Sequence, residues 1–317
     1  MTASPIDRLT HRPGGRITRR SALGVALAGL TAVTLTPAAA REATPPAIPA
    51  AGWDAVEALI AEAEATGGVV GVAIYGADGE VFAHHGDRRF RAASTIKVPI
   101  LIEAWRQIDS GELSLDETLH LRDEDRVGGS GVLGNMHTGT ELTFGDLLYL
   151  MIAVSDNTAT NLVIDRVGMD PVNATMASLG MTNSVLGRRI LGHLPAPGDP
   201  ENWATPRDFG VAMQAIVADE AASPESCARM RETLAQQGEI RRINRFIPDG
   251  TDLRWGTKPG DLPGAVNDVG YVSSDRGTIC VAAFCENLPD LDTAERTIGL
   301  IAREAMVLTG IASFDSD

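Results

Sequence analysis

The order of its secondary-structure patterns is the feature that most constrains how this chain can fold. Strand patterns mark residues 69–75 and 81–85 near the start, and residues 253–258, 266–273 and 278–284 near the end. Helical patterns mark 53–66, 95–110, 143–154, 157–167, 171–179, 206–218 and 291–308. We therefore predict an α+β fold, in which an antiparallel sheet from both chain ends is flanked by helices and an all-helical lobe is inserted between them.

The expected domain limits follow from the same order. Residues 52–317 should form one domain. Its α/β lobe should cover about 52–95 and 208–310, and its helical lobe about 96–207. Residues 41–51, which are rich in Pro and Ala, are expected to be a linker.

The first forty residues differ from the rest of the chain. They hold five arginines and one acidic residue, Asp7, and an apolar run covers 22–35. Arg19 and Arg20 form a twin-arginine pattern, and the alanines at 38–40 suit a signal peptidase. The apolar run is too short to span a bilayer comfortably. We predict a twin-arginine signal peptide over 1–40, with export to the periplasm, the cell wall or the medium and no stable membrane insertion.

Charge and cysteine content limit the partners and the covalent framework. Without residues 1–40 the chain carries 22 basic and 41 acidic residues, a net charge near −19, which argues against a nucleic-acid partner. Cys227, Cys280 and Cys285 are odd in number, and odd spacing directs the last two to opposite faces of one strand. We expect buried free thiols, with a single bridge through Cys227 as the alternative.

Lysine is almost absent from this chain. Of its 27 basic residues 25 are arginines, and the two lysines are Lys97 and Lys258. Arginine supplies a positive charge but cannot readily release a proton, whereas a buried lysine can become a neutral base. A catalytic proton carrier is therefore expected at one of the two lysines, and chance survival in an Arg-rich chain is the alternative.

Ser94 lies three residues before Lys97, where an irregular stretch meets a predicted helix. One helical turn would stack the amine near the hydroxyl. An unassisted serine is a poor nucleophile that needs a neighbouring base, and N–H groups at a helix start can stabilise the oxyanion formed when a carbonyl is attacked. A serine at this position can also be a simple N-cap, and S-x-x-K alone is common by chance.

Two further segments complete a pattern. Residues 155–157 read S-D-N between two predicted helices, and residues 258–260 read K-P-G on a predicted strand. With S-x-x-K, in this order and spacing, they resemble the class A β-lactamases and their penicillin-binding relatives, whose signature is S-x-x-K, S-D-N and K-T-G. The resemblance extends over about residues 52–310 and includes both lysines.

The resemblance implies a serine hydrolase that opens a β-lactam amide through an acyl-enzyme on Ser94. Lys97 would be the base for Ser94, and Ser155 would relay a proton to the leaving nitrogen. Asn157 would contact the substrate amide, and Lys258 would be an electrostatic anchor near Ser155.

The same resemblance implies further contacts around the substrate. The backbone N–H groups of Ser94 and Asp261 would form the oxyanion hole, with Gly260 beside them on the strand. Ser130, in a glycine-rich loop, would reach the substrate. Asp156 would face away from the substrate and brace its own loop.

Two departures from the family pattern bear on function. Pro259 stands where the family has Thr or Ser, and it offers neither a hydroxyl nor an N–H to a substrate carboxylate. Strand alternation should direct the neighbouring Thr257 to the other face.

Class A enzymes also carry a Glu that activates water for deacylation. It should fall within residues 189–191, which hold no carboxylate.

His193, Asp199 and Glu201 are the nearest candidates for a water base. We expect Glu201 to pair with Arg188 or Arg189, and we take His193 as the hypothesis for the water base.

Other patterns carry less weight. Gly129, Gly131 and Gly134 match G-x-G-x-x-G, but no strand precedes them, so we expect a loop rather than a dinucleotide site. The chain has no G-x-S-x-G, and its six histidines show no zinc-ligand spacing, with His84 and His85 read as a surface pair. No metal or organic cofactor is expected.

The sequence is compatible with three functions. The first is a β-lactamase, the second a peptidase or esterase of the same superfamily that acts on cell-wall peptides or small esters, and the third a penicillin-binding sensor that acylates without turnover. The expected partner is a small-molecule β-lactam or acyl substrate, and a monomer is the default.

Overall fold

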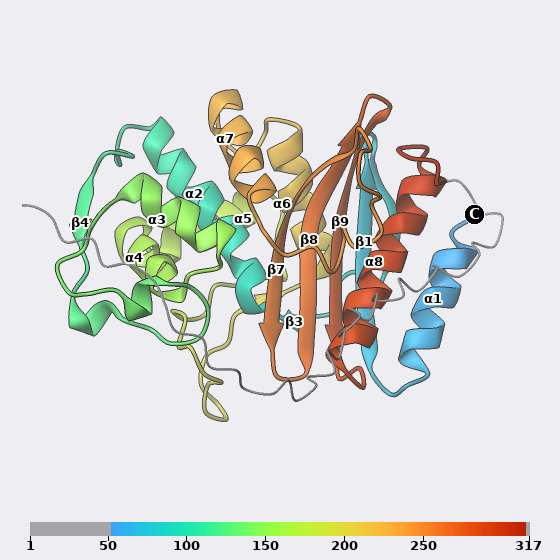
Figure 1. Cartoon of the computed structure of the whole chain (residues 1–317), viewed down its shortest axis with the longest axis horizontal. Coiled ribbons are helices and arrows are strands. Elements are labelled where there is room, and N and C mark those ends of the chain that lie inside the picture. The colour runs from blue at the N-terminus through green and yellow to red at the C-terminus, as the bar shows by residue number, and fades with distance from the viewer. Residues whose placement is uncertain (1–51, 315–317) are drawn as a thin grey trace, which may run out of the picture. The chain divides into compact units, whose positions relative to one another are not determined.

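The computed structural model describes residues 52–314, so the predicted signal peptide and linker lie outside the described residues. Five strands form one antiparallel sheet in the order β2-β1-β9-β8-β7 (Figure 1). The strands are β1 (Val69–Gly76), β2 (Gly79–His84), β7 (Arg254–Leu262), β8 (Ala265–Ser274) and β9 (Gly277–Glu286). The predicted α+β fold, with its sheet built from both chain ends, is confirmed.

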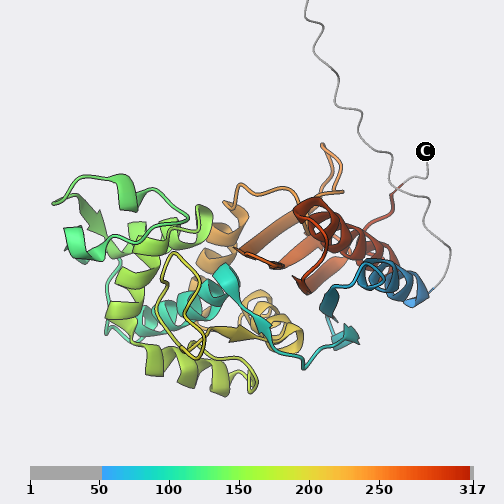
Figure 2. The ribbon, with the colours of Figure 1, turned by 90° about the horizontal axis from the view of Figure 1, so that it is seen from below.

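Helices from both chain ends cover the outer face of the sheet. These are α1 (Asp54–Glu64) and α8 (Leu291–Leu308), which contact each other on the side of the sheet away from the other helices (Figure 2). Ile298 and Ile301 of α8 pack with Ile74 and Val281 of the sheet in one buried apolar cluster. Burial of each large apolar side chain on this face of the helix stabilises the fold by about 1.5–3 kcal/mol. This packing holds the two chain ends together.

The other helices lie on the inner face and extend beyond the sheet. They are α2 (Lys97–Asp109), α3 (Phe144–Ala153), α4 (Asn157–Val167), α5 (Met169–Ser178), α6 (Pro206–Val217) and α7 (Pro224–Ala235). Helix α2 is central, because residues 97–105 are all buried and the helix contacts α3, α4, α5 and α7. The first turns of α2 are thus enclosed on every side, and its first residue, Lys97, lies in the interior with them.

Several short elements were not predicted from the sequence. They are the strand pairs β3 (Phe90–Arg91) with β6 (Trp203–Ala204) and β4 (Thr118–His120) with β5 (Glu141–Thr143), and the 3₁₀ turns η1 (Ala93–Ile96), η2 (Asp123–Asp125) and η3 (Leu133–Asn135). Helix α7 was also missed, because a polar sequence surrounds its few buried apolar positions. The predicted helix over 95–110 begins instead at Lys97, with η1 ahead of it.

The cysteines behave as expected. All three are free and buried, and Cys280 and Cys285 belong to the apolar clusters on opposite faces of the sheet. Burial raises the pKa of both thiols to about 12, so they stay protonated and unreactive. Among the described residues, no helix is both long enough and apolar enough to cross a membrane.

Asp156 ties the glycine-rich loop to the helical lobe. Its buried carboxylate caps α4 by accepting from Ala159 N at 2.9 Å, and accepts from Val132 N and Leu133 N at 2.6 and 2.8 Å. Gly131 has φ +105°, and a Cβ there would lie 2.3 Å from the Asp156 side chain. The glycine is therefore required for close packing, and the predicted bracing by Asp156 is confirmed.

Candidate active site

The three sequence motifs meet where the inner face of the sheet joins the helical lobe. Ser94 lies in η1, and Lys97 is the first residue of α2. Ser155 lies between α3 and α4, and Lys258 lies on β7. Three separate parts of the fold thus converge on one site.

The hydroxyl of Ser155 lies between the two lysine amines. Nζ of Lys97 and Nζ of Lys258 each donate to Ser155 Oγ at 3.1 Å. Lys97 Nζ also donates to Ser155 O at 2.6 Å and to Asn157 Oδ1 at 3.0 Å, and Lys258 Nζ donates to Pro259 O at 2.9 Å. The three acceptors around Lys97 suit an ammonium group. A neutral Lys97, with two N–H groups, donates to two of these acceptors and keeps a lone pair that can take a proton.

Both lysines are fully buried, and this changes their acidity. Burial, and then the nearby charge of Lys258, lowers the pKa of Lys97 well below its ordinary value, against the opposing effect of Asp156. Burial also lowers the pKa of Lys258 to about 7, against the opposing charges of Asp268 and Asp261. Two such amines do not readily carry protons at the same time. Lys97 is therefore suited to act as a neutral base.

The backbone around the site is strained at two non-glycine positions. Ala93, just before Ser94, has φ +48°, and Ser155 has φ +55°. Such left-handed conformations cost on the order of 1 kcal/mol each and cluster at functional sites. On the facing strand, a Cβ at Gly260 would lie 2.9 Å from Ser94 N, so only glycine lets β7 pass this close to η1.

Two cavities share Ser94, Ser130 and Asp261 in their walls, with volumes of about 280 and 200 Å³. Asn157 lines the larger one, and Ser155 lines the smaller one. Lys97 and Lys258 lie behind Ser155, to which both are hydrogen-bonded. The structure thus brings together the residues predicted to react with the substrate or bind it, which are Ser94, Ser130, Ser155, Asn157, Lys97, Lys258, Gly260 and Asp261.

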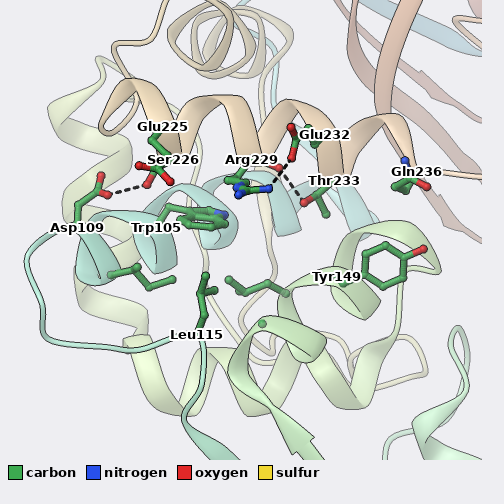
Figure 3. Close-up of a pocket in the computed structure, with 13 residues that line it drawn as sticks. Trp105, Asp109, Leu115, Tyr149, Glu225, Ser226, Arg229, Glu232, Thr233 and Gln236 are labelled. Atoms are coloured by element: carbon green, nitrogen blue, oxygen red, sulfur yellow. Dashed lines mark hydrogen bonds and ion pairs between the residues drawn. The ribbon is translucent and has the colours of Figure 1, made fainter.

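A larger cavity lies elsewhere, between α2, α3 and α7 (Figure 3). Its volume is about 630 Å³, and some of its polar groups are paired with one another, as Arg229 is with Glu232 at 3.1 Å and Ser226 with Asp109 at 2.6 Å. None of the motif residues lines it. Size alone therefore does not identify the reactive site.

A family model described as the beta-lactamase enzyme family matches residues 53–308. The chain belongs to that family. A crystal structure of a beta-lactamase from Sphaerobacter thermophilus is similar, with 51% identity, a TM-score of 0.81, and coverage of 83% of this chain and 100% of that one. The predicted membership of the class A β-lactamase type of serine hydrolases is confirmed.

Curated β-lactamases agree with this assignment. Beta-lactamase OXY-2 of Klebsiella oxytoca is 26% identical over 82% of this chain and 91% of its own length. Beta-lactamase L2 of Stenotrophomonas maltophilia is 31% identical over 62% of this chain, which spans 66% of that relative.

The first departure from the β-lactamase pattern is visible in the cavity wall. Pro259 lines the smaller cavity without a hydroxyl. Thr257 is buried and pairs with Gly270, where a Cβ would lie 2.7 Å from Thr257 Cγ2. Lys258 pairs with Val269, which belongs to the inner apolar cluster, so Thr257 faces the outer side. Thr257 thus does not replace the missing hydroxyl.

The second departure is the segment after α5 where β-lactamases of class A carry their Glu. Ile190 lines the larger cavity, and Asn161 of α4 holds its backbone, accepting from Ile190 N at 2.9 Å and donating to Ile190 O at 2.8 Å. Among residues 52–314, the carboxylates that line this cavity are Glu201 and Asp261, and each is paired with an arginine. Neither is free to activate water.

Three residues of the segment after α5 are candidates for the base that activates water. Glu201 binds Arg188 at 2.6 Å, which confirms the expected pairing, and Asp199 accepts from Ala196 N in a turn. His193 lines the cavity, and its Nδ1 lies 2.8 Å from Leu194 O. Because a carbonyl only accepts, Nδ1 carries the proton, which leaves Nε2 of a neutral ring as an acceptor.

Arg242 is a residue of the site that sequence reasoning missed. It is buried beneath the cavities, where it pairs with Asp261, donates to Asn267 O at 2.8 Å and lies 3.4 Å from Glu295. Asn267 in turn donates to Arg91 O at 2.8 Å and braces the turn before Ser94. Among 25 arginines, nothing in the sequence marks Arg242 as different.

Proposed function

We propose that Ser94 attacks the carbonyl of a β-lactam and that Lys97, as a neutral amine, takes the hydroxyl proton. The observation that carries this proposal is the buried Lys97 amine, one turn after Ser94 and hydrogen-bonded to Ser155 and Asn157. The backbone N–H groups of Ser94 and Asp261 stabilise the oxyanion. Ser155 then passes a proton to the ring nitrogen as the C–N bond breaks, which leaves an acyl-enzyme.

Hydrolysis of that acyl-enzyme is the slow step in this proposal. Water must be activated to attack the ester, and the two carboxylates of the cavity are already paired with arginines. His193 offers an acceptor nitrogen in the same cavity and takes the role of base. The enzyme should therefore acylate faster than it turns over.

A second candidate, a peptidase or esterase, is favoured by Pro259 in the wall of the smaller cavity, because such substrates need no hydroxyl at that position. Turnover of a chromogenic cephalosporin, simple esters and D-Ala-D-Ala peptides separates the two. We expect turnover of the cephalosporin, absent in Ser94→Ala. Fast ester cleavage with no reaction of the cephalosporin would refute the β-lactam assignment.

Export belongs to the same proposal. The twin-arginine pattern and the alanines at 38–40 support removal of residues 1–40. The mass of the protein recovered outside the cytoplasm checks this, since a chain that begins at Arg41 is expected and a chain that retains the leader would contradict it.

A further inference from the structure

Three metal-binding side chains converge at the edge of the sheet, far from the cavities described above. Glu64 ends α1, His84 ends β2, and His85 follows it directly. Glu64 Oε1 lies 3.5 Å from His84 Nε2 and 3.7 Å from His85 Nε2, and the three ligand atoms all lie within 4.8 Å of one another. Side chains of two elements thus surround one point.

The backbone is shaped so that both imidazoles reach that point. Successive residues of a strand point to opposite faces, so adjacent histidines should diverge. His85 breaks the alternation with φ +49°, a left-handed conformation that is uncommon outside glycine. The two rings consequently lie with their centroids 4.3 Å apart. Glu64 is held in place, because its Oε1 accepts from Val70 N at 2.9 Å.

Hydrogen bonds within the protein do not account for the cluster. His84 Nε2 is buried and has no hydrogen-bond partner among residues 52–314, although Glu64 Oε1 is nearby. An imidazole nitrogen that bears no proton directs a lone pair at the shared point, and a metal ion there would accept that lone pair.

We propose that Glu64, His84 and His85 form a Zn²⁺ site. Zinc is bound by imidazole nitrogen and carboxylate oxygen at about 2.0–2.2 Å, so tetrahedral ligands lie about 3.3–3.5 Å apart. The two distances to Glu64 Oε1 are close to this value. The side chains are between 26 and 47% exposed, which leaves room for water as the fourth ligand.

The site has a structural role and takes no part in the reaction at Ser94. β2 is at the opposite edge of the sheet from β7, four strand spacings or about 19 Å away. The ion joins the end of α1 to the end of β2, so binding should stabilise the fold. At a zinc concentration of about 100 times the dissociation constant, the melting temperature should rise by roughly 5 °C.

Calorimetric titration of the untagged protein with Zn²⁺ tests the proposal, with Mg²⁺ as a comparison. We expect one Zn²⁺ per chain and no Mg²⁺ uptake, because Mg²⁺ prefers an all-oxygen octahedron. His85→Asn keeps a residue that tolerates the left-handed backbone, and Glu64→Gln keeps an acceptor for Val70 N. Loss of a residue that only hydrogen-bonds a metal ligand typically weakens metal binding by roughly 10–100-fold. Each of these variants loses a ligand itself, so zinc binding should weaken by at least that much.

The double variant His120→Ala with His137→Ala is the matched control, since both histidines lie outside the cluster. It should bind Zn²⁺ like the parent. The proposal would be overturned if the parent did not bind Zn²⁺, or if His85→Asn and Glu64→Gln bound Zn²⁺ with the affinity of the parent. Acylation of Ser94 by a penicillin should be unchanged in all of these variants, so the result is independent of the proposed function.

Discussion

Replacing Lys97 by Arg should slow acylation of Ser94 by about a thousandfold, because a positioned general base contributes roughly 10²–10⁴-fold and a guanidinium does not act as one. The Lys97 amine is fully buried and hydrogen-bonded to Ser155 and Asn157, so the substitution changes the proton acceptor itself. The rate constant is measured by rapid quenching and intact mass after a penicillin is added. Thermal unfolding shows whether the variant stays folded.

Lys258→Arg is the matched control for this substitution. Lys258 is equally buried and contacts the same hydroxyl, but its proposed role is electrostatic. An arginine keeps that charge, so the loss should be smaller than for Lys97→Arg. Acylation of Lys97→Arg at nearly the parent rate would remove Lys97 from the role of base.

The pH dependence of acylation follows from the two lysines. The reaction needs neutral Lys97, and burial, followed by the nearby charge of Lys258, lowers its pKa well below the ordinary value. The rate should therefore fall as the pH drops through that pKa. Lys258, with a pKa of about 7, loses its charge above that pH, and attraction for an anionic substrate then weakens. kcat/KM should therefore show a bell-shaped pH profile, whose limits belong to the coupled pair.

Replacing Ile190 by Glu should speed hydrolysis of the acyl-enzyme by up to about a hundredfold, since the carboxylate would add a second base for water to the proposed His193 and a positioned base contributes roughly 10²–10⁴-fold. Ile190 lines the cavity that contains Ser94, and Asn161 fixes its backbone with two hydrogen bonds. A carboxylate there would be free of the arginines that occupy Glu201 and Asp261. The decay of the acyl-enzyme mass after removal of free penicillin measures the effect.

Ile190→Gln separates the base from the change in shape. Glutamine has nearly the same size as glutamate but cannot accept a proton from water, so it should leave hydrolysis close to the parent rate. Both variants lose an apolar side chain packed against the core, and each should cost about 1–2 kcal/mol of stability. Equal hydrolysis rates in the two variants would show that the missing carboxylate does not limit turnover.

The sheet and the helical lobe were predictable because their strands and helices carry long apolar patterns. The site was predictable because its three motifs occur in the order and spacing of the family signature and include both lysines of the chain. Arg242 was not, because its role depends on burial beneath Asp261 and on a neighbour, Glu295, from a distant helix. The convergence of His84 and His85 was equally hidden, because it requires a left-handed φ that breaks strand alternation.

Intact-protein mass spectrometry over time after addition of a penicillin, with Ser94→Ala in parallel, tests the central claim most directly. A Ser94-dependent adduct that forms quickly and clears slowly is the predicted result. An adduct that also forms on Ser94→Ala, or no adduct together with no hydrolysis of the penicillin, would contradict the acyl-enzyme mechanism.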